Sequence, residues 1–278
     1  MERLWLITNL KSGSADGGKA QALEAVCAEQ GLVIVGRTLF PAEALPDAAM
    51  LGQAGADTLM LYAGDGTINA ALCRLGRWPG AVLILPGGTM NMLAKRLHGD
   101  KDAEGIVHAA YEGARTVRLH HVEVGARRAF VGLIAGPAAT WGHARELARE
   151  GRWRRMVQAA RHAWTRSWSG EIVVRARRQG NRRYNAVYVT ARDNGSLTVS
   201  AIAAEGWADL ARLGWEWLKG DWRQAPGVDE SRASELVLAS GRRVIHALFD
   251  GEEVLLKSPV HIRTAMSELS FVTTVEGG

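Results

Sequence analysis

The first 118 residues alternate short apolar segments with stretches of helical periodicity, and this alternation restricts the fold more than any other feature. The apolar segments end in glycine, proline or polar residues, as buried strands do, and they cover residues 4–8, 32–37, 58–62 and 81–85. The helical stretches between them cover residues 18–30, 44–52, 67–75 and 91–97. Such a series predicts a parallel sheet with helices on both faces. Ligands of these sheets bind beyond the carboxyl ends of the strands.

After residue 118 the pattern changes to short strands separated by polar turns, with two helical stretches at 141–168 and 206–219. The strands are expected at 121–124, 129–134, 171–178, 184–190, 197–202, 235–239, 244–249, 254–256 and 261–264. We therefore predict two domains. The first is a Rossmann-like parallel α/β domain at 1–118, and the second is an antiparallel β-sandwich at 119–264. The tail 265–278 can pack back on the first domain.

The composition argues against a membrane-spanning or secreted protein. No apolar run reaches the roughly 18 residues that a membrane-spanning helix needs, and the run after Met1 is too brief for a signal peptide. Cys27 and Cys73 belong to no metal-binding or redox pattern, which is typical of buried thiols in a reducing compartment. We expect a cytoplasmic protein, with at most a peripheral attachment at the inner face of the membrane.

The net charge of +5 is concentrated in one basic segment. Residues 145–183 hold twelve arginines against three glutamates, and tryptophans accompany the arginines within the predicted helix 141–168. Such a surface suits anionic lipid headgroups, although nucleic acid or plain solvent would also be compatible with it.

The segment Tyr62–Ala70 places a Gly-Asp-Gly turn between a strand and a helix. Backbone amides and the positive end of the helix dipole meet at such a turn, and glycines let a phosphate approach. Asp65 is a candidate ligand for Mg²⁺, directly or through water. Thr67 is a candidate N-cap and phosphate ligand. An ordinary strand-to-helix turn with Thr67 as its cap explains the same residues.

Two further loops of this kind follow other strands of the predicted sheet. Gly87–Thr89 lead into a helix, so a second set of amide donors and a second cap are expected. Asn91 can bind a nucleotide or close a local turn. The first strand ends in the glycine- and serine-containing loop Asn9–Gly13, where Lys11 can neutralise phosphate or remain a surface lysine.

Together these motifs resemble the diacylglycerol kinase catalytic superfamily, which includes bacterial lipid kinases and sphingosine kinases. The family has Asn-Pro-x-Ser-Gly after the first strand, Gly-Gly-Asp-Gly-Thr and Pro-x-Gly-Thr-x-Asn-x-x-Ala after later strands, and Asp-Gly-Glu in the second domain. These patterns fall here on Asn9–Gly13, Ala63–Thr67, Pro86–Ala94 and Asp250–Glu252, in the family's order. The chain departs at two of these positions, where Leu10 replaces the proline and an alanine replaces the first glycine.

The resemblance implies an ATP- and Mg²⁺-dependent lipid kinase that phosphorylates a hydroxyl of diacylglycerol or a related lipid, in the cleft between the domains. It implies that Asp250 or Glu252 accepts the proton of that hydroxyl. Asp65 is the candidate ligand for the metal. The residues that the resemblance assigns to the nucleotide are Asn9, Lys11, Ser12, Gly13, Thr38, Gly64, Asp65, Gly66, Thr67, Asn69, Gly87, Gly88, Thr89 and Asn91. The lipid would be met at a membrane surface through segment 145–183, without a specific nucleic acid.

Two other functions stay open at this point. An NAD kinase shares the Gly-Asp-Gly-Thr turn and the two-domain layout, although the stretch Gly88–Ala94 favours the lipid branch. A lipid- or nucleotide-binding module that has lost catalysis is the other alternative. The presence of Asp65, Asp250 and Glu252 speaks against it.

Overall fold

A computed structural model describes residues 1–9, 17–88, 91–113, 115–136, 172–176, 179–202 and 228–275 of the chain. The chain divides into two units, one made of Met1–Leu119 with Met266–Gly278 and the other of His120–Ala265. From the sequence, the boundaries are expected at 118/119 and 264/265. Most of the basic segment 145–183 and both predicted helices of the second domain, 141–168 and 206–219, lie outside the described residues.

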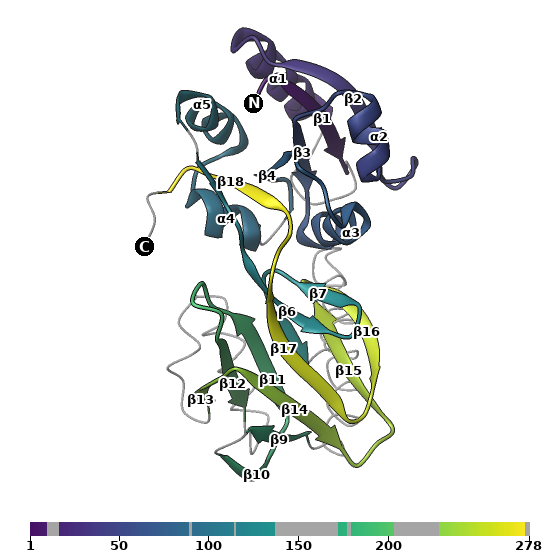
Figure 1. Cartoon of the computed structure of the whole chain (residues 1–278), viewed down its shortest axis with the longest axis vertical. Coiled ribbons are helices and arrows are strands. Elements are labelled where there is room, and N and C mark those ends of the chain that lie inside the picture. The colour runs from purple at the N-terminus through teal and green to yellow at the C-terminus, as the bar shows by residue number, and fades with distance from the viewer. Residues whose placement is uncertain are drawn as a thin grey trace, which may run out of the picture. The chain divides into compact units, whose positions relative to one another are not determined.

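The first unit contains a six-stranded sheet in which most neighbouring strands are parallel, as the sequence predicts (Figure 1). In spatial order its strands are β2 (Val33–Leu39), β1 (Arg3–Thr8), β3 (Thr58–Ala63), β4 (Ala81–Pro86), β18 (Ser270–Thr273) and β5 (Arg115–Val117). The strands from β2 to β18 run parallel, and β5 runs antiparallel to β18. The C-terminal strand β18 therefore belongs to the sheet of the N-terminal unit.

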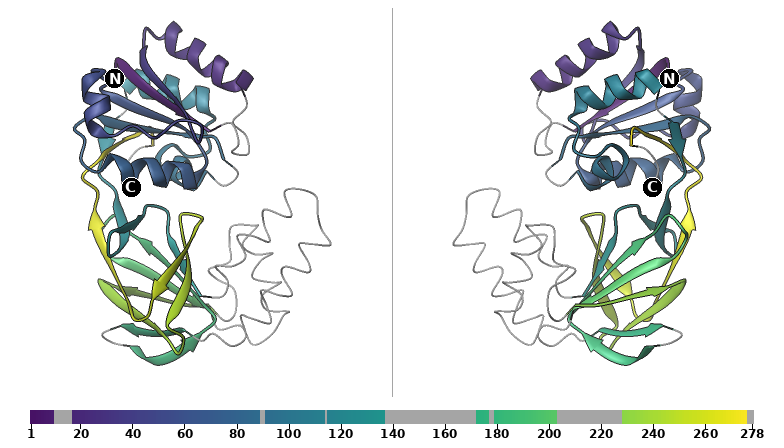
Figure 2. Two further views of the ribbon diagram at one scale, coloured as in Figure 1. Left: turned by 90° about the vertical axis from the view of Figure 1, so that its right-hand side faces the viewer. Right: turned by 90° about the vertical axis from the view of Figure 1, so that its left-hand side faces the viewer.

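Helices cover both faces of this sheet, with α1 and α5 on one face and α3 and α4 on the other (Figure 2). The helices are α1 (Gly17–Glu29), α2 (Ala48–Gln53), α3 (Asp65–Leu75), α4 (Met92–His98) and α5 (Ala103–Gly113). Cys27 of α1 and Ile106 of α5 are buried with the strand residues Leu4, Met60 and Leu83. Burial of these apolar side chains holds the helices on the sheet. None of the described helices is long and apolar enough to cross a membrane.

Two helices begin two or more residues away from the predicted start. Helix α2 begins at Ala48 and not at 44, because the Asp47 carboxylate caps it by accepting a hydrogen bond from the Met50 amide (3.0 Å). Helix α3 begins at Asp65, ahead of the expected 67, with Gly64 as its N-cap.

The second unit is an antiparallel β-sandwich, which confirms the predicted fold class. In spatial order one sheet contains β10 (Gln179–Tyr184), β9 (Ile172–Ala176), β14 (Glu235–Ser240), β17 (Val260–Met266), β6 (His120–Val124) and β7 (Arg127–Ala129). The other contains β13 (Val228–Ala233), β12 (Leu197–Ile202), β11 (Ala186–Ala191), β8 (Leu133–Ala135), β15 (Val244–Phe249) and β16 (Glu252–Lys257). Val122, Val174 and Leu238 of the first sheet share a core with Val189 and Phe249 of the second.

Candidate functional site

The loops that follow β3 and β4 pack backbone against backbone. A Cβ atom added to Gly87 would lie 2.6 Å from Ala63 N, and one added to Gly88 would lie 2.6 Å from Gly64 Cα. The Gly87 amide also donates a hydrogen bond to the Ala63 carbonyl oxygen (3.3 Å). Since no side chain fits between the loops, they form a single backbone edge at the carboxyl end of the sheet.

Helix α3 begins at this edge. Its N-cap Gly64 is extended, with φ −80° and ψ 162°, and forms no side-chain cap, so the expectation of Thr67 as the cap is wrong. Thr67 lies within the first turn, and its hydroxyl accepts a hydrogen bond from Asn9 Nδ2 (2.9 Å), which ties the end of β1 to the helix. The carboxylate of Asp65 in the same turn is stabilised by the helix dipole. First-turn amides make no bonds within their helix, which is the geometry of an anion-binding helix start.

The loop after β4 is closed by its own residues. Asn91 has the left-handed φ of 50°, and its Oδ1 accepts a hydrogen bond from the Gly88 amide (2.6 Å). The amides of Gly87 and Gly88 therefore both have partners inside the protein, contrary to the expectation that they are donors to phosphate. Of the two roles that the sequence leaves open for Asn91, the structure shows the local one.

Of the other residues predicted to bind the nucleotide, Gly66 lies in the first turn of α3, and the rest are buried or lie outside the described ranges. Thr38 on β2 is buried, and its hydroxyl accepts a hydrogen bond from Trp5 Nε1 (3.0 Å). Asn69 in α3 is buried, and its Oδ1 lies 3.4 Å from the Cys73 thiol that donates to it. The residues outside the described ranges are Lys11, Ser12, Gly13 and Thr89. Contacts of all these residues with a nucleotide stay predictions.

The surroundings of Asp65 fit a magnesium ion that arrives with phosphate. The described residues contain no group of three or more His, Cys, Asp or Glu side chains placed to hold a metal. Mg²⁺ commonly uses one or two protein carboxylates and completes its coordination with phosphate oxygens and water. Asp65 supplies one such carboxylate at the start of α3, next to the glycine loops after β3 and β4.

Asp250 shapes the hairpin turn between β15 and β16 and also holds a distant loop. Asp250 and Gly251 have φ of 48° and 94°, the signs that a two-residue hairpin turn requires, and Phe249 pairs with Glu252 across it. The Asp250 side chain is 8% exposed, and its carboxylate oxygens accept hydrogen bonds from the three backbone amides of residues 130–132, at 2.8 to 2.9 Å. These bonds give Asp250 a structural function that its motif does not reveal.

Glu252 is the exposed carboxylate of the same turn and begins β16. Partial desolvation raises the pKa of Glu252, and the positive charge of Arg127 opposes that rise. A raised pKa makes a carboxylate a stronger proton acceptor. Two carboxylates are predicted from the sequence as the base. Glu252 is exposed, whereas both carboxylate oxygens of Asp250 accept hydrogen bonds from the loop 130–132.

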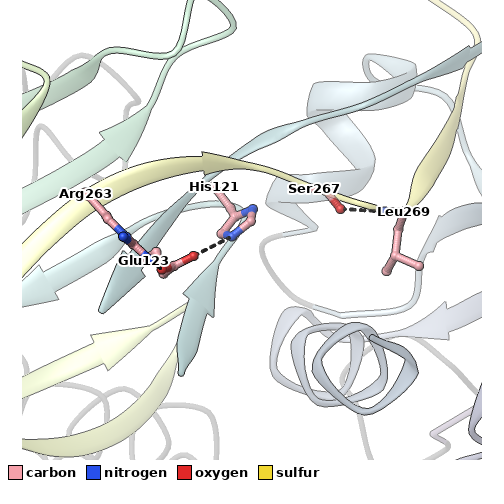
Figure 3. Close-up of polar contacts among 5 residues, drawn as sticks. All are labelled: His121, Glu123, Arg263, Ser267 and Leu269. Atoms are coloured by element: carbon pink, nitrogen blue, oxygen red, sulfur yellow. Dashed lines mark hydrogen bonds and ion pairs between the residues drawn. The ribbon is translucent and has the colours of Figure 1, made fainter. Parts of the chain in front are cut away.

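His121 packs against Phe130 of the loop that Asp250 holds. It is 2% exposed, its ring centroid lies 5.2 Å from that of Phe130, and its Nε2 lies 3.8 Å from Glu123 Oε2 (Figure 3). Glu123 also pairs with Arg263 of β17. Burial above all, with a further contribution from Arg128, lowers the pKa of His121 to about 4, so its ring is neutral at pH 7.

Comparisons with known proteins agree with the motifs and the fold. The family model of the diacylglycerol kinase catalytic domain matches residues 3–124. A solved structure of a diacylglycerol kinase from Bacillus anthracis str. Sterne has a TM-score of 0.66 at 12% identity, covering 98% of this chain and 96% of that chain. A second structure from the same organism, described as a candidate diacylglycerol kinase, has a TM-score of 0.70 at 15% identity. The match covers 98% of this chain and 97% of that chain. No curated protein sequence matches the chain. Residues 3–124 are therefore similar in sequence to the diacylglycerol kinase catalytic domain, and the chain shares the fold of these solved structures.

Proposed function

We propose that the chain is an ATP-dependent kinase that transfers the γ-phosphate to a hydroxyl of diacylglycerol or a related lipid. The observation that carries the proposal is the match of residues 3–124 to the diacylglycerol kinase catalytic domain, on a unit whose glycine loops form one backbone edge. The description of the structures of similar fold as diacylglycerol kinases supports the choice of acceptor.

The phosphates of the nucleotide are proposed to bind at the first turn of α3. Gly64 and Gly88 are in contact and carry no side chains, so an anion can approach the backbone closely. Mg²⁺ held by Asp65 would neutralise charge on the phosphate oxygens. Thr67, through its bond to Asn9, holds the end of β1 at the same turn.

Glu252 is the proposed base. As the acceptor oxygen forms its bond to the γ-phosphorus, its O–H bond breaks and the proton passes to a carboxylate oxygen of Glu252. The bond between the γ-phosphorus and its bridging oxygen breaks, and ADP leaves with that electron pair. Asp250 acts through Glu252, because it fixes the hairpin turn from which β16 starts.

The same proposal places the enzyme in the cytoplasm, where it meets its lipid at the inner face of a membrane. Its support is the arginine- and tryptophan-rich sequence of segment 145–183. Arginine and tryptophan side chains are favoured at the headgroup level of anionic bilayers.

The direct test is a transfer assay on the purified full chain. With labelled ATP, Mg²⁺ and vesicles that contain diacylglycerol, phosphatidylglycerol or a sphingoid base, the label is expected on a lipid. A parallel incubation replaces the vesicles with NAD. Label on NAD, or no label on any lipid, would contradict the proposal.

Two variants test the residue assignments. Asp65→Asn and Glu252→Gln are each expected to lower kcat/KM by at least about 100-fold, because a general base or a metal ligand commonly contributes that much. Glu253→Gln is the matched control, since Glu253 is the exposed next residue on the opposite face of β16. It is expected to keep the wild-type rate, and equal losses in Glu252→Gln and Glu253→Gln would refute the assignment of the base.

A further inference from the structure

We propose that Arg127 is a positioning residue for the phosphoryl acceptor site: its guanidinium faces Glu252 across the neighbouring edges of the two sheets and keeps that carboxylate able to take a proton. The inference rests on the proposed function in that Glu252 acts as the base. No motif of the sequence points to Arg127, because its relation to Glu252 arises only from the folding of the two sheets.

Arg127 and Glu252 lie on the terminal strands of different sheets. Strand β7 ends one sheet of the sandwich and β16 ends the other. The two edges lie on the same side of the sandwich, because the Phe130 amide just after β7 donates a hydrogen bond to Asp250 just before β16 (2.8 Å). Figure 1 accordingly shows β7 alongside β16.

Both residues occupy positions on the inner side of their sheets. Arg127 pairs across β6 and β7 with Val124, which packs against the sandwich core, and Glu252 pairs across β15 and β16 with Phe249, which is part of that core. Cross-strand partners in an antiparallel pair project from the same face. The opposite charges therefore face each other at the edge of the sandwich, where both side chains remain exposed.

The neighbouring charged groups are directed elsewhere. Arg128 pairs with Glu123 on the outer face of its sheet, and its charge acts on His121. On β16, Glu253 follows Glu252 and projects from the opposite face. The Asp250 carboxylate is bonded to the amides of residues 130–132. Among the described residues, Arg127 is the charged side chain that acts on Glu252.

The position of Arg127 leaves the Glu252 carboxylate able to accept a proton. The described residues show no direct ion pair between Arg127 and Glu252, so the carboxylate oxygens can still accept a proton. A nearby cation favours the ionised form of a carboxylate, while desolvation favours the neutral form. Removing the cation therefore raises the pKa of Glu252, and a larger fraction of the base is protonated at low pH. Arg127 on this reasoning sets the acidic limit of activity, whereas the rate at alkaline pH is unaffected.

The kinetic test compares Arg127→Gln, Arg127→Lys and the matched control Arg128→Gln, with kcat/KM for the labelled lipid measured against pH. Arg127→Gln is expected to move the acidic limb to higher pH, with a loss of about threefold or more on that limb and little loss at alkaline pH. Arg127→Lys keeps the charge and should keep the wild-type profile, as should Arg128→Gln. An Arg127→Gln profile that is unchanged, or lowered equally at every pH, would overturn the inference.

A second readout does not need activity. The carboxyl carbon of Glu252 is titrated by NMR in the full chain, and its signal is assigned by its loss in Glu252→Gln. The pKa of Glu252 is expected to be higher in Arg127→Gln than in the wild type and Arg127→Lys. An unchanged titration overturns the inference even in an active kinase. If no lipid is phosphorylated by the wild type, the proposed function fails, and the titration still decides whether Arg127 acts on Glu252.

Discussion

At the scale of single residues, the contacts of Asp250 give it a measurable contribution to stability. Asp250→Ala leaves the amides of residues 130–132 without their acceptor and places alanine at φ 48°. Unsatisfied buried amides and a left-handed alanine together are expected to lower the free energy of unfolding by about 3 kcal/mol or more. Urea denaturation followed by circular dichroism measures this loss.

Asp250→Asn provides the comparison. Asparagine tolerates the left-handed conformation and keeps one acceptor oxygen, so a smaller loss of stability is expected. The exposed neighbour Glu253, changed to alanine, should cost well under 1 kcal/mol. If Asp250→Ala were as stable as Glu253→Ala, the hydrogen bonds to residues 130–132 would make no contribution to the free energy of unfolding.

At the scale of elements, the close approach of the loops after β3 and β4 makes a prediction about glycine. In Gly88→Ala the added Cβ would lie 2.6 Å from Gly64 Cα and 3.2 Å from Asn91 Oδ1. The loops must separate to admit it, which is expected to cost about 1 to 3 kcal/mol of stability. Because the start of α3 moves with Gly64, the KM for ATP should rise as well. Thermal unfolding and steady-state kinetics measure the two effects.

Gly52→Ala is the control for this change. Gly52 lies in α2, and a Cβ atom added there meets nothing within 4 Å. Alanine is favoured over glycine in a helix interior by about 0.5 to 1 kcal/mol, so this variant should be slightly more stable than the wild type. Gly88→Ala with wild-type stability and KM would show that the two loops are not held together as the structure has them.

At the scale of the whole molecule, each unit contains a buried histidine that opposes folding at acid pH. Burial is the largest cause that lowers the pKa of His98 in α4 and of His121 in β6 to about 4, from the usual value of 6.5. Between pH 6.5 and 4 the unfolded chain binds protons that the folded chain does not, so the free energy of unfolding falls as the pH falls. At pH 5 each histidine is expected to cost about 2 kcal/mol relative to pH 7.5.

Urea denaturation at pH 7.5 and pH 5 tests this expectation. His98→Gln and His121→Gln should each reduce the loss of stability between the two pH values, whatever they do to stability at pH 7.5. The exposed His261 on β17, changed to glutamine, should leave the loss unchanged. An equal pH dependence in all three variants would mean that both buried histidines take up protons without unfolding.

Local patterns were enough to predict the class of both units. The alternation of strands and helices up to residue 118 identifies a parallel sheet, because periodicity reports which face of each element is buried. The same periodicity is present in α5, where Ile106, Val107 and Ala110 have helical spacing, but no helix is among the elements predicted there. The start of α3 was predicted late, since Thr67 is a better cap by residue type than the glycine that the structure uses.

The sequence by itself determined the β/α order, the sandwich that follows it and the motifs that carry the family, because each depends on residues close together in the chain. Only the tertiary structure decided what those motif residues do. Asp250 reaches amides 118 to 120 positions away, and the charge of Arg127 on another sheet acts on Glu252. Contacts across such separations depend on how sheets pack, which no local pattern encodes. For that reason the different roles of the two carboxylates, Asp250 as a structural acceptor and Glu252 as an exposed group, are defined only in the folded protein.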